Sequence, residues 1–537
     1  MKKTILFALC ALVLAAMLVS CGGKEPYMIQ TLTYPENIVK TLEERGLTPE
    51  SFAAFAAGNT SYQGNAGREE TNLVVSPYFT AVLDEEILPV YATPVYIGSE
   101  YRGTLHSFAS ADVSFGNHKK ITLTLTVDPG VSVERAEVFA NDPAKLTQSG
   151  QTITLEIGSY GTYTLVLNDS QDAAFTLFVR EYADENSEIA AYQEKYGEDK
   201  VLIYEPGLHE VDPILLSGDS VLYLKAGALL LPKHTIDIQT DEAAAGSAEE
   251  GAVEANAIGL NRFPVVNACN AENITIAGRG TIDMTRLDWH ERRGVVFTLC
   301  KNITVDGLIL VNPCEWAYIN YRCEGVSVTQ SAVFGYRTNS DAFAICNSVN
   351  VNVTDSFART GDDMFEVKTL GGEETAVSRD ITFSRCVAWG SKARCFGVIG
   401  EIERDVSNIL FEDGIVLFRD ATWDNDRIGS LVVLRETGHG AVDNVTFRNI
   451  TIHKDFGRPI LCGNYSMDLT ESKLEGIQFE NITYTADMQA QVWRNAGEGN
   501  LLDVTFQKVT GNGEALTEGN LSKLVFYDSA DSITVTE

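Results

Sequence analysis

A short motif recurs through the second half of the chain and limits its fold more than any other feature. Each copy is a polar turn, often containing asparagine, followed by an apolar, a polar and a second apolar residue. The interval between copies is mostly in the twenties to low thirties of residues. The copies begin at Glu272, Lys301, Glu324, Val349, Arg379, Ser407, Asp443, Glu475 and Leu502.

A period of this length is typical of stacked architectures. Helical patterns are missing from the repeats, the leucine-asparagine frame of leucine-rich repeats is not present, and propeller blades need about forty residues each. We therefore predict an all-β parallel β-helix over residues 201–537. Coils about 4.8 Å apart would pair every strand edge and share one core. Asparagine suits the turns because it tolerates left-handed backbone angles and can stack on the next coil.

A different residue pattern precedes the repeats. Segments such as Ile121-Thr-Leu-Thr-Leu-Thr-Val and Gln151-Thr-Ile-Thr-Leu-Glu-Ile alternate polar and apolar residues between short turns. This pattern predicts a small β-sandwich over residues 71–185. A charged helical linker over residues 186–200 would join it to the β-helix.

The N-terminal residues predict export rather than folding. Residues 1–20 carry two lysines and an apolar run, as secretory signals do. The ending Leu18-Val-Ser-Cys21 resembles a bacterial lipobox, which implies lipidation of Cys21 and a cell-envelope lipoprotein. Which membrane leaflet holds the anchor is left open, and a plain signal peptide with a chance cysteine is the alternative. Residues 21–70 would form a tether with short helices at 37–45 and 49–57.

Charge and cysteine content exclude some partners. The net charge of −33 argues against nucleic acid, because phosphate binding needs lysine and arginine surfaces. It argues mildly against a polyanionic substrate as well. The eight cysteines after Cys21 show no zinc-finger spacing, and none can be assigned to a disulfide pair. No later segment is apolar for long enough to span a bilayer, so the lipid anchor would be the membrane contact. We expect no cofactor and no metal.

Three aspartates are the candidate catalytic residues. Asp341 and the pair Asp362-Asp363 lie about one repeat apart and follow strands at a comparable phase. Stacking would therefore bring them to one face, roughly 5–10 Å from one another. Glycoside hydrolysis uses such carboxyls, one to protonate the leaving oxygen and one to activate water.

Asn339-Ser-Asp341 and Thr360-Gly-Asp-Asp363 resemble the motifs of the polygalacturonase-like hydrolases, glycoside hydrolase families 28 and 49. Residues 388–413, with the sandwich ahead of the β-helix, look more like the dextranase and isopullulanase family. The resemblance implies a right-handed, pectin-lyase-like β-helix, a glycan substrate and an inverting mechanism. It also implies that Asp362 is the acid and that Asp341 or Asp363 assists water attack.

The chain departs from family 28 in two places. Arg394-Cys-Phe-Gly stands where that family has Gly-His-Gly one coil after the aspartate pair, and Gly438-His-Gly440 lies too far downstream. Arg427-Ile-Gly429 lacks the lysine of the Arg-x-Lys that grips a substrate carboxylate. Both differences favour a neutral glycan, with an α-glucan such as dextran as the working choice.

Several neighbours of the aspartates are predicted to bind substrate. They are Tyr336, Arg337, Asn339, Lys368, Trp389, Lys392, Arg394 and Glu401. Ordinary ion pairing is the alternative for the cations, and burial in the coil core is the alternative for Trp389 and for Trp316, a second possible sugar platform. Glu366 should point outward, because it alternates with Phe365 and Val367.

Two other functions fit the same aspartates. A Ca²⁺ site would make the protein a polysaccharide lyase, with a cation base and an unsaturated product. A glycan-binding β-helix without catalysis is the third hypothesis.

Overall fold

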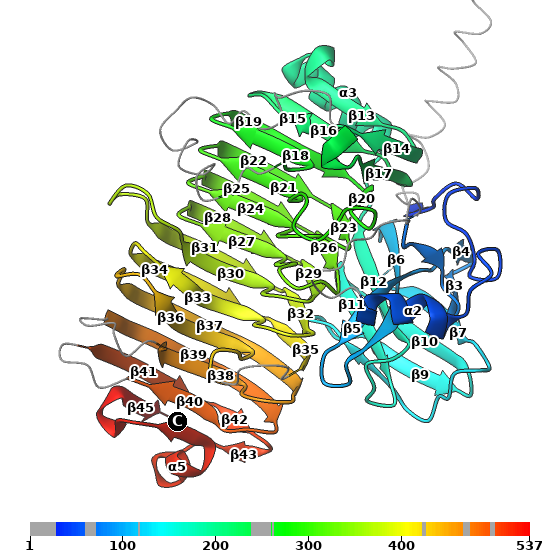
Figure 1. Ribbon diagram of the computed structural model, residues 1–537. Coiled ribbons are helices and arrows are strands. Elements are labelled where there is room, and N and C mark those ends of the chain that lie inside the picture. The colour runs from blue at the N-terminus through cyan, green and yellow to red at the C-terminus, as the bar shows by residue number, and fades with distance from the viewer. Residues whose placement is uncertain are drawn as a thin grey trace, which may run out of the picture.

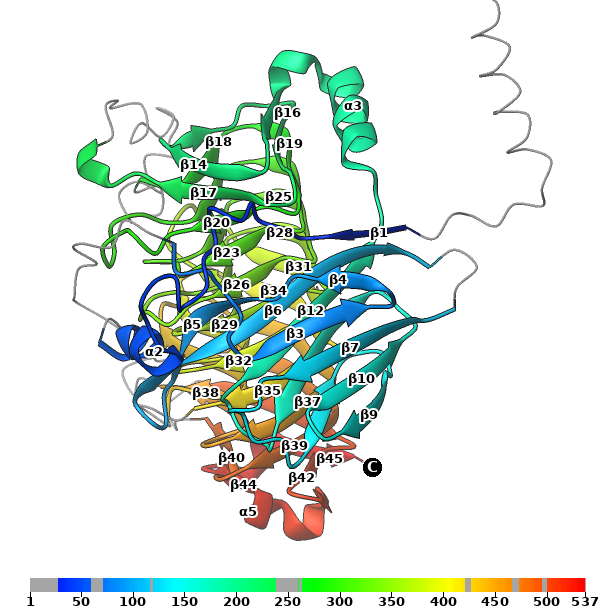
Figure 2. The ribbon, with the colours of Figure 1, turned by 90° about the vertical axis from the view of Figure 1, so that its right-hand side faces the viewer.

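The computed structural model describes residues 28–58, 71–115, 119–237, 259, 263–420, 426–465, 473–494 and 500–536. The predicted signal peptide and Cys21 lie outside these residues. A β-sandwich and a long parallel β-helix lie side by side (Figures 1 and 2), which confirms the predicted fold class. Within the described ranges, no helix is long and apolar enough to cross a membrane.

The β-helix winds through two sheets whose strands pair in parallel with the next coil, apart from one antiparallel pair in the part of the chain that the structure describes, formed by Thr510–Gly511 and Glu514–Ala515. The smaller sheet has 11 strands among the described residues. They are β15 (Ile214–Leu215), β18 (Val266–Cys269), β21 (Val295–Thr298), β24 (Tyr318–Tyr321), β27 (Phe343–Cys346), β30 (Phe365–Thr369), β33 (Phe396–Ile402), β36 (Leu431–Thr437), β38 (Ile460–Asn464), β40 (Ala490–Trp493) and β44 (Val525–Tyr527).

The larger sheet has 22 strands among the described residues and covers the remaining sides of the coils. They are β13 (Val201–Tyr204), β14 (Gly207–Val211), β16 (Ser220–Leu224), β17 (Ala228–Pro232), β19 (Glu272–Gly278), β20 (Thr281–Asp283), β22 (Lys301–Asp306), β23 (Ile309–Val311), β25 (Glu324–Thr329), β26 (Ala332–Phe334), β28 (Val349–Thr354), β29 (Phe357–Thr360), β31 (Ser378–Ser384), β32 (Val387–Gly390), β34 (Val406–Glu412), β35 (Ile415–Arg419), β37 (Val442–Asp455), β39 (Lys473–Ala486), β41 (Leu501–Gln507), β42 (Thr510–Gly511), β43 (Glu514–Ala515) and β45 (Ile533–Thr536).

The register follows the sequence repeat. Glu324 pairs with Lys301 on one side and with Val349 on the other, so equivalent motif positions stack directly. The turn asparagines form ladders: Asn444 Nδ2 donates to Asn408 Oδ1 at 2.9 Å, and both residues have a left-handed φ near 55°. The predicted stacking of turn asparagines is confirmed.

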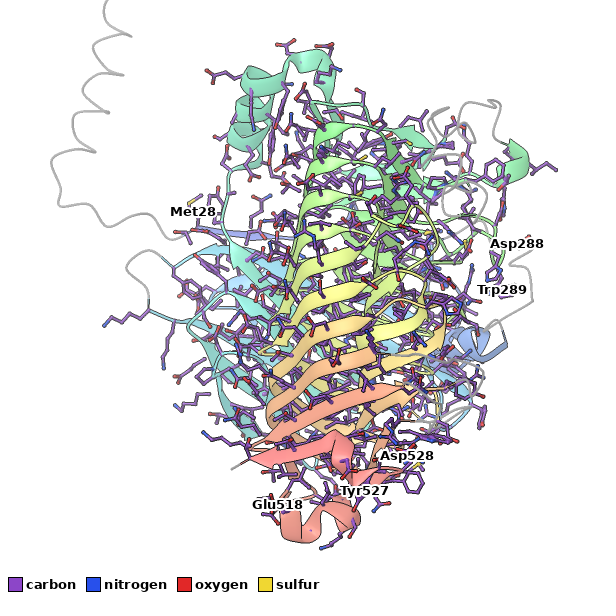
Figure 3. All side chains as sticks on the ribbon, turned by 90° about the vertical axis from the view of Figure 1, so that its left-hand side faces the viewer. Met28, Asp288, Trp289, Glu518, Tyr527 and Asp528 are labelled. Atoms are coloured by element: carbon purple, nitrogen blue, oxygen red, sulfur yellow. The ribbon has the colours of Figure 1, made fainter. Side chains whose placement is uncertain are left out.

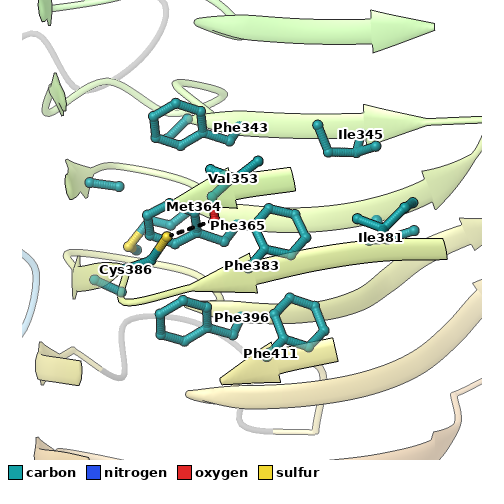
Figure 4. Packing of buried hydrophobic residues seen from close by; sticks show 14 of the residues in the cluster. Phe343, Ile345, Val353, Met364, Phe365, Ile381, Phe383, Cys386, Phe396 and Phe411 are labelled. Carbon is teal, nitrogen blue, oxygen red and sulfur yellow. Dashed lines mark hydrogen bonds between the residues drawn. The ribbon is translucent and has the colours of Figure 1, made fainter. Parts of the chain in front are cut away.

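Aromatic rings fill the interior of the coils (Figure 4). Phe365 stacks between Phe343 and Phe396, with ring centroids 5.2 and 5.0 Å away. A second column continues through Phe383, Phe411, Phe447, Phe479 and Phe506. Full burial of each ring contributes about 1.5–3 kcal/mol, which makes this column a main source of β-helix stability.

The sandwich consists of two sheets packed around an apolar core. One sheet contains β1 (Met28–Thr31), β2 (Val74–Val75), β5 (Tyr91–Ile97), β6 (Arg102–Ser114), β8 (Ala136–Phe139), β11 (Gly161–Leu167) and β12 (Ala174–Glu181). The other contains β3 (Phe79–Leu83), β4 (Glu86–Leu88), β7 (Ile121–Val127), β9 (Lys145–Ser149) and β10 (Thr152–Ile157).

The first of these sheets also packs against the β-helix, over the face formed by β23, β26, β29 and β32 (Figure 2). Phe108 stacks on Phe334 with centroids 5.0 Å apart. Arg359 Nη1 lies 2.9 Å from His106 Nδ1 in this buried contact. Burial lowers the pKa of His106 well below its usual value, so the ring is neutral and Nδ1 accepts the bond.

The helical segments differ in part from expectation. Helix α2 (Pro49–Gly58) and helix α3 (Glu185–Tyr196) form where helical patterns are present, and a four-residue helix, α5 (Leu521–Leu524), lies near the C-terminus. Residues 37–45 form turns instead of the predicted helix. Residues 28–31, assigned from sequence to a tether, pair with β6 as strand β1 because their backbone completes an open sheet edge.

Candidate active site

The three aspartates come together at the turns that enter two adjacent strands of the smaller sheet. Asp341 precedes β27, and Asp362 and Asp363 precede β30 one coil later. Each carboxylate places one oxygen within 4.8 Å of the others. We call these three residues the acidic cluster. The separation between the carboxylate oxygens is shorter than the predicted range, because the three side chains point toward one another.

Backbone contacts fix the two turns against each other. The amide of Asn339 donates to Asp362 Oδ2 at 2.9 Å, and Asn339 adopts a left-handed φ of 60°. The amide of Asp363 donates to Asp362 Oδ1 at 3.1 Å. Gly361 is required here, since a Cβ at this position would lie 2.2 Å from the carbonyl oxygen of Arg337.

Two cations hold the cluster. Arg394 binds Asp363 twice, from its backbone amide to Oδ1 and from Nη1 to Oδ2, both at 3.0 Å. Lys368 Nζ is 3.8 Å from Asp341 Oδ2 and 3.9 Å from Asp363 Oδ2. It also pairs with Glu366 at 3.0 Å and Glu401 at 3.4 Å. The site therefore gathers more carboxyl groups than cations around Lys368.

The three carboxyls occupy different environments. Burial raises the pKa of Asp341 well above its usual value, and the charges of Asp362 and Glu366 raise it further. Among the described residues, Asp341 Oδ1 has no hydrogen-bond partner. Burial and the neighbouring Asp363 raise the pKa of Asp362, which is the most exposed of the three. Asp363 is held directly by the guanidinium of Arg394.

Glu366 faces outward from the coil interior, as its alternation predicts, yet it is fully buried. Burial raises its pKa to about 8, against the opposing effect of Lys368. Burial also lowers the pKa of Lys368, but Glu366, Glu401 and the aspartates outweigh this effect and leave it well above the usual value. The lysine is therefore a fixed positive charge of the site.

The structure places five of the eight predicted substrate-binding residues around the cluster: Asn339, Lys368, Lys392, Arg394 and Glu401. Lys392 Nζ donates to Thr338 Oγ1 at 2.9 Å, and burial lowers its pKa to about 8. Trp316 is half-buried and lies 4.7 Å from Lys368 Nζ.

The other three side chains are buried and bonded away from the cluster, so the structure does not place them as substrate contacts. Trp389 lies beneath the sandwich, where its Nε1 donates to Gln171 Oε1 at 2.9 Å. Arg337 donates to the carbonyls of Leu287 and Thr285 at 2.8 and 3.0 Å. The hydroxyl of Tyr336 bonds Asn312 Nδ2 at 3.0 Å. Sequence pattern does not show how the two domains dock or how a loop folds back.

Other residues of the site were not predicted from sequence. His290 Nε2 lies 2.9 Å from Asn339 Oδ1, and Trp289 Nε1 donates to the carbonyl of Thr338 at 2.9 Å. Glu436 binds the second Nη of Arg394. Trp289 and His290 lie two coils before Asp341 and three coils before the aspartate pair, so only the three-dimensional path of the loop reveals them.

The sites that family 28 would use for a uronate are occupied differently here. Arg427 offers its carbonyl oxygen to Arg394 Nε at 2.8 Å, and its guanidinium lies 4.8 Å over the ring of Tyr465. Gly440 of the downstream Gly-His-Gly packs on the backbone of Arg404.

The acidic cluster has the hard oxygen atoms that a divalent cation prefers. Lys368 and Arg394 already contact two of its members, however, and would repel a cation at the same place. The donor set therefore suits charge balance by protein side chains better than by a bound ion.

The chain is similar in sequence to known proteins. Residues 235–518 match the family model of glycosyl hydrolases family 28. Polygalacturonase QRT2 of Arabidopsis thaliana is 25% identical over 236 residues, covering 40% of this chain and 50% of the relative. A polygalacturonase of Malus domestica is 23% identical over 239 residues, covering 40% and 48%. The chain thus spans about half the length of the curated relatives it matches.

The solved structure of Dex49A from Penicillium minioluteum shares the fold, with a TM-score of 0.58 at 11% identity. The superposition covers 89% of this chain and 97% of Dex49A, so it includes the sandwich as well as the β-helix. The family match extends over more than half of the chain and contains the whole acidic cluster. The chain belongs to glycosyl hydrolases family 28.

Proposed function

We propose that this protein is an inverting glycoside hydrolase that cleaves a neutral glycan at the acidic cluster. The observation that carries the proposal is the convergence of three carboxyls with unequal environments at one point of the β-helix. Family membership supports hydrolysis of a glycosidic bond, and the site supports the assignment of roles.

Asp362 is the general acid in this proposal. Its raised pKa keeps a proton available for the leaving oxygen, and its greater exposure lets it contact a substrate. Asp363 is the base, because its carboxylate contacts both Arg394 and Lys368. Asp341 assists Asp363 from the adjacent coil.

The carboxyl oxygens of all three aspartates lie within 4.8 Å of one another, which is shorter than the usual spacing of an inverting pair, so the proposal places the attacking water between Asp341 and Asp363. Inverting pairs usually stand about 6.5–9.5 Å apart to admit a water between acid and base. A water that donates two hydrogen bonds of about 2.8 Å spans roughly 4.5 Å between its acceptors. The distance limit of 4.8 Å among the cluster oxygens permits this bridge between Asp341 and Asp363.

The charge of the site supports a neutral substrate. Lys368 and Arg394 are both paired with carboxylates, and Arg427 stacks on Tyr465. Binding a uronate at Lys368, Arg394 or Arg427 would cost one of these contacts. The same contacts argue against Lys368 or Arg394 as the base of a lyase.

The N-terminal sequence supports export and lipidation at Cys21 in the cell envelope. Palmitate labelling of the full chain and of Cys21→Ser would test this proposal: label on the first alone is expected, and equal labelling would overturn it.

The hydrolase proposal is tested by digesting neutral and acidic polysaccharides with the purified protein. We expect new reducing ends from a neutral glycan, no ultraviolet-absorbing product, no effect of chelator, and loss of turnover in Asp362→Asn. An unsaturated product that requires Ca²⁺ would establish the lyase instead. Cleavage confined to galacturonan would leave hydrolysis intact and overturn the substrate class.

A further inference from the structure

A continuous row of contacts leads away from the acidic cluster toward the sandwich. Its centre is Thr338, next to the residue whose amide binds Asp362. The carbonyl of Thr338 accepts from Trp289 Nε1, and its hydroxyl accepts from Lys392 Nζ, both at 2.9 Å. Lys392 in turn lies 5.0 Å over the ring of Tyr96 in the sandwich. The β-helix and the sandwich therefore share one wall on the Asp362 side.

Trp289 is held rigidly in this wall while remaining half-exposed. Its ring stacks on His290 with centroids 3.5 Å apart and an interplanar angle of 22°. His290 is in turn bonded to Asn339. Figure 3 shows Trp289 at the outer edge of the molecule, beside Asp288 and away from the coil interior. An indole fixed at its nitrogen and by a stacked ring cannot turn away when a ligand arrives.

The contacts of the sandwich hold the wall in place. Ser391 Oγ donates to the carbonyl of Tyr96 at 2.7 Å, and the amide of Gly98 donates to Asp420 Oδ2 at 2.8 Å. The first contact joins the end of β5 to the coil that follows the aspartate pair, and the second joins it to the next coil. The sandwich is therefore attached to the coils of the site next to Lys392.

We propose that Trp289 is the stacking platform of a subsite for a neutral pyranose ring, beside Asp362. The inference rests on the proposed function and adds the position of the sugar. A flat apolar ring matches the C–H face of a sugar, and the polar edge of the indole is already used to fix its orientation. Because Asp362 is the acid, the subsite lies next to the leaving oxygen.

The experiment measures binding separately from turnover. Isomaltotetraose, nigerotetraose, cellotetraose and tetragalacturonate are titrated by calorimetry into the full chain carrying Asp362→Asn. At least one neutral tetramer should bind. Adding Trp289→Ala should weaken that binding roughly tenfold, as loss of one aromatic contact implies. Trp289→Tyr should restore most of the affinity, since it returns a ring.

Trp493→Ala is the matched control, because Trp493 is also partly exposed but ends β40, four strands along the sheet from β30. It should leave the affinity unchanged, and the melting temperature of each variant reports folding. Equal affinity with and without Trp289, binding of tetragalacturonate alone, or no binding of any neutral tetramer would overturn the inference. Turnover by the wild-type chain tests the proposed function independently, so either idea can fail without the other.

Discussion

Alternating residues of strand β30 form two faces that have different roles. Phe365 and Val367 point into the coil, where Phe365 continues an aromatic column. Glu366 and Lys368 point to the other side, where the lysine joins four carboxylates. One coil earlier the residues paired with Glu366 and Lys368 are Ala344 and Cys346. The apolar residues of the inner face thus repeat from coil to coil and stabilise the fold. The residues of the outer face differ from one coil to the next at the acidic cluster.

The largest effect is expected on kcat, from a substitution in the acidic cluster on the outer face of the coils. Asp363→Asn should lower kcat about a thousandfold, within the range of general acid–base catalysis. The change also weakens the buried ion pair with Arg394, so kcat is measured on the folded fraction of each variant. Asp503→Asn, an exposed change on a distant coil, should leave kcat unchanged. A kcat within tenfold of wild type would remove Asp363 from the mechanism.

The matching change on the inner side should affect folding instead. Phe365→Ala should lower the free energy of unfolding by about 3–5 kcal/mol, because the cavity lies between two stacked rings. Denaturant unfolding measures this loss. The protein that remains folded should keep kcat within about tenfold. A thousandfold loss of kcat with full stability would mean that the two faces are not separable.

The pH dependence of the free energy of unfolding tests the environment of Glu366 on the outer face. The folded-state pKa of Glu366, about 8, lies above the usual value near 4.5. The protonated form is therefore favoured by folding, and this contribution is present below about pH 4.5 and is lost as pH rises through 8. Glu366→Gln does not titrate, so its stability relative to wild type should rise by a few kcal/mol between pH 5 and 9. Unfolding curves at both pH values measure the difference, and a pH-independent difference would contradict the account.

The smallest effect on stability is expected in the turns, whose asparagines repeat from coil to coil as the core residues do. Asn444→Ala should cost about 1 kcal/mol, because it removes a hydrogen bond and places alanine in a left-handed conformation. Asn444→Gly should recover part of that loss, since glycine accepts the conformation without strain. Equal stability of the alanine and wild-type proteins would show that the ladder contributes nothing.

Sequence pattern predicts the features that repeat and misses those that do not. The motif beginning at Glu272 recurs in register, so it predicted both the β-helix and the meeting of Asp341 with Asp362 and Asp363. Trp389 was misplaced because its burial depends on how the sandwich docks. Trp289 was missed because the path of its loop, rather than any periodicity, brings it to Thr338. Strand β1 escaped notice because four residues carry too short a pattern.

The most direct test of the proposed chemistry is the configuration of the first product. Proton NMR of the initial hydrolysis of a cleaved neutral glycan reports the anomer released before mutarotation. A water held by Asp341 and Asp363 attacks opposite the leaving group, so the new reducing end should have the inverted configuration. A first product with retained configuration would contradict the account, because it would require an aspartate as the nucleophile in place of water.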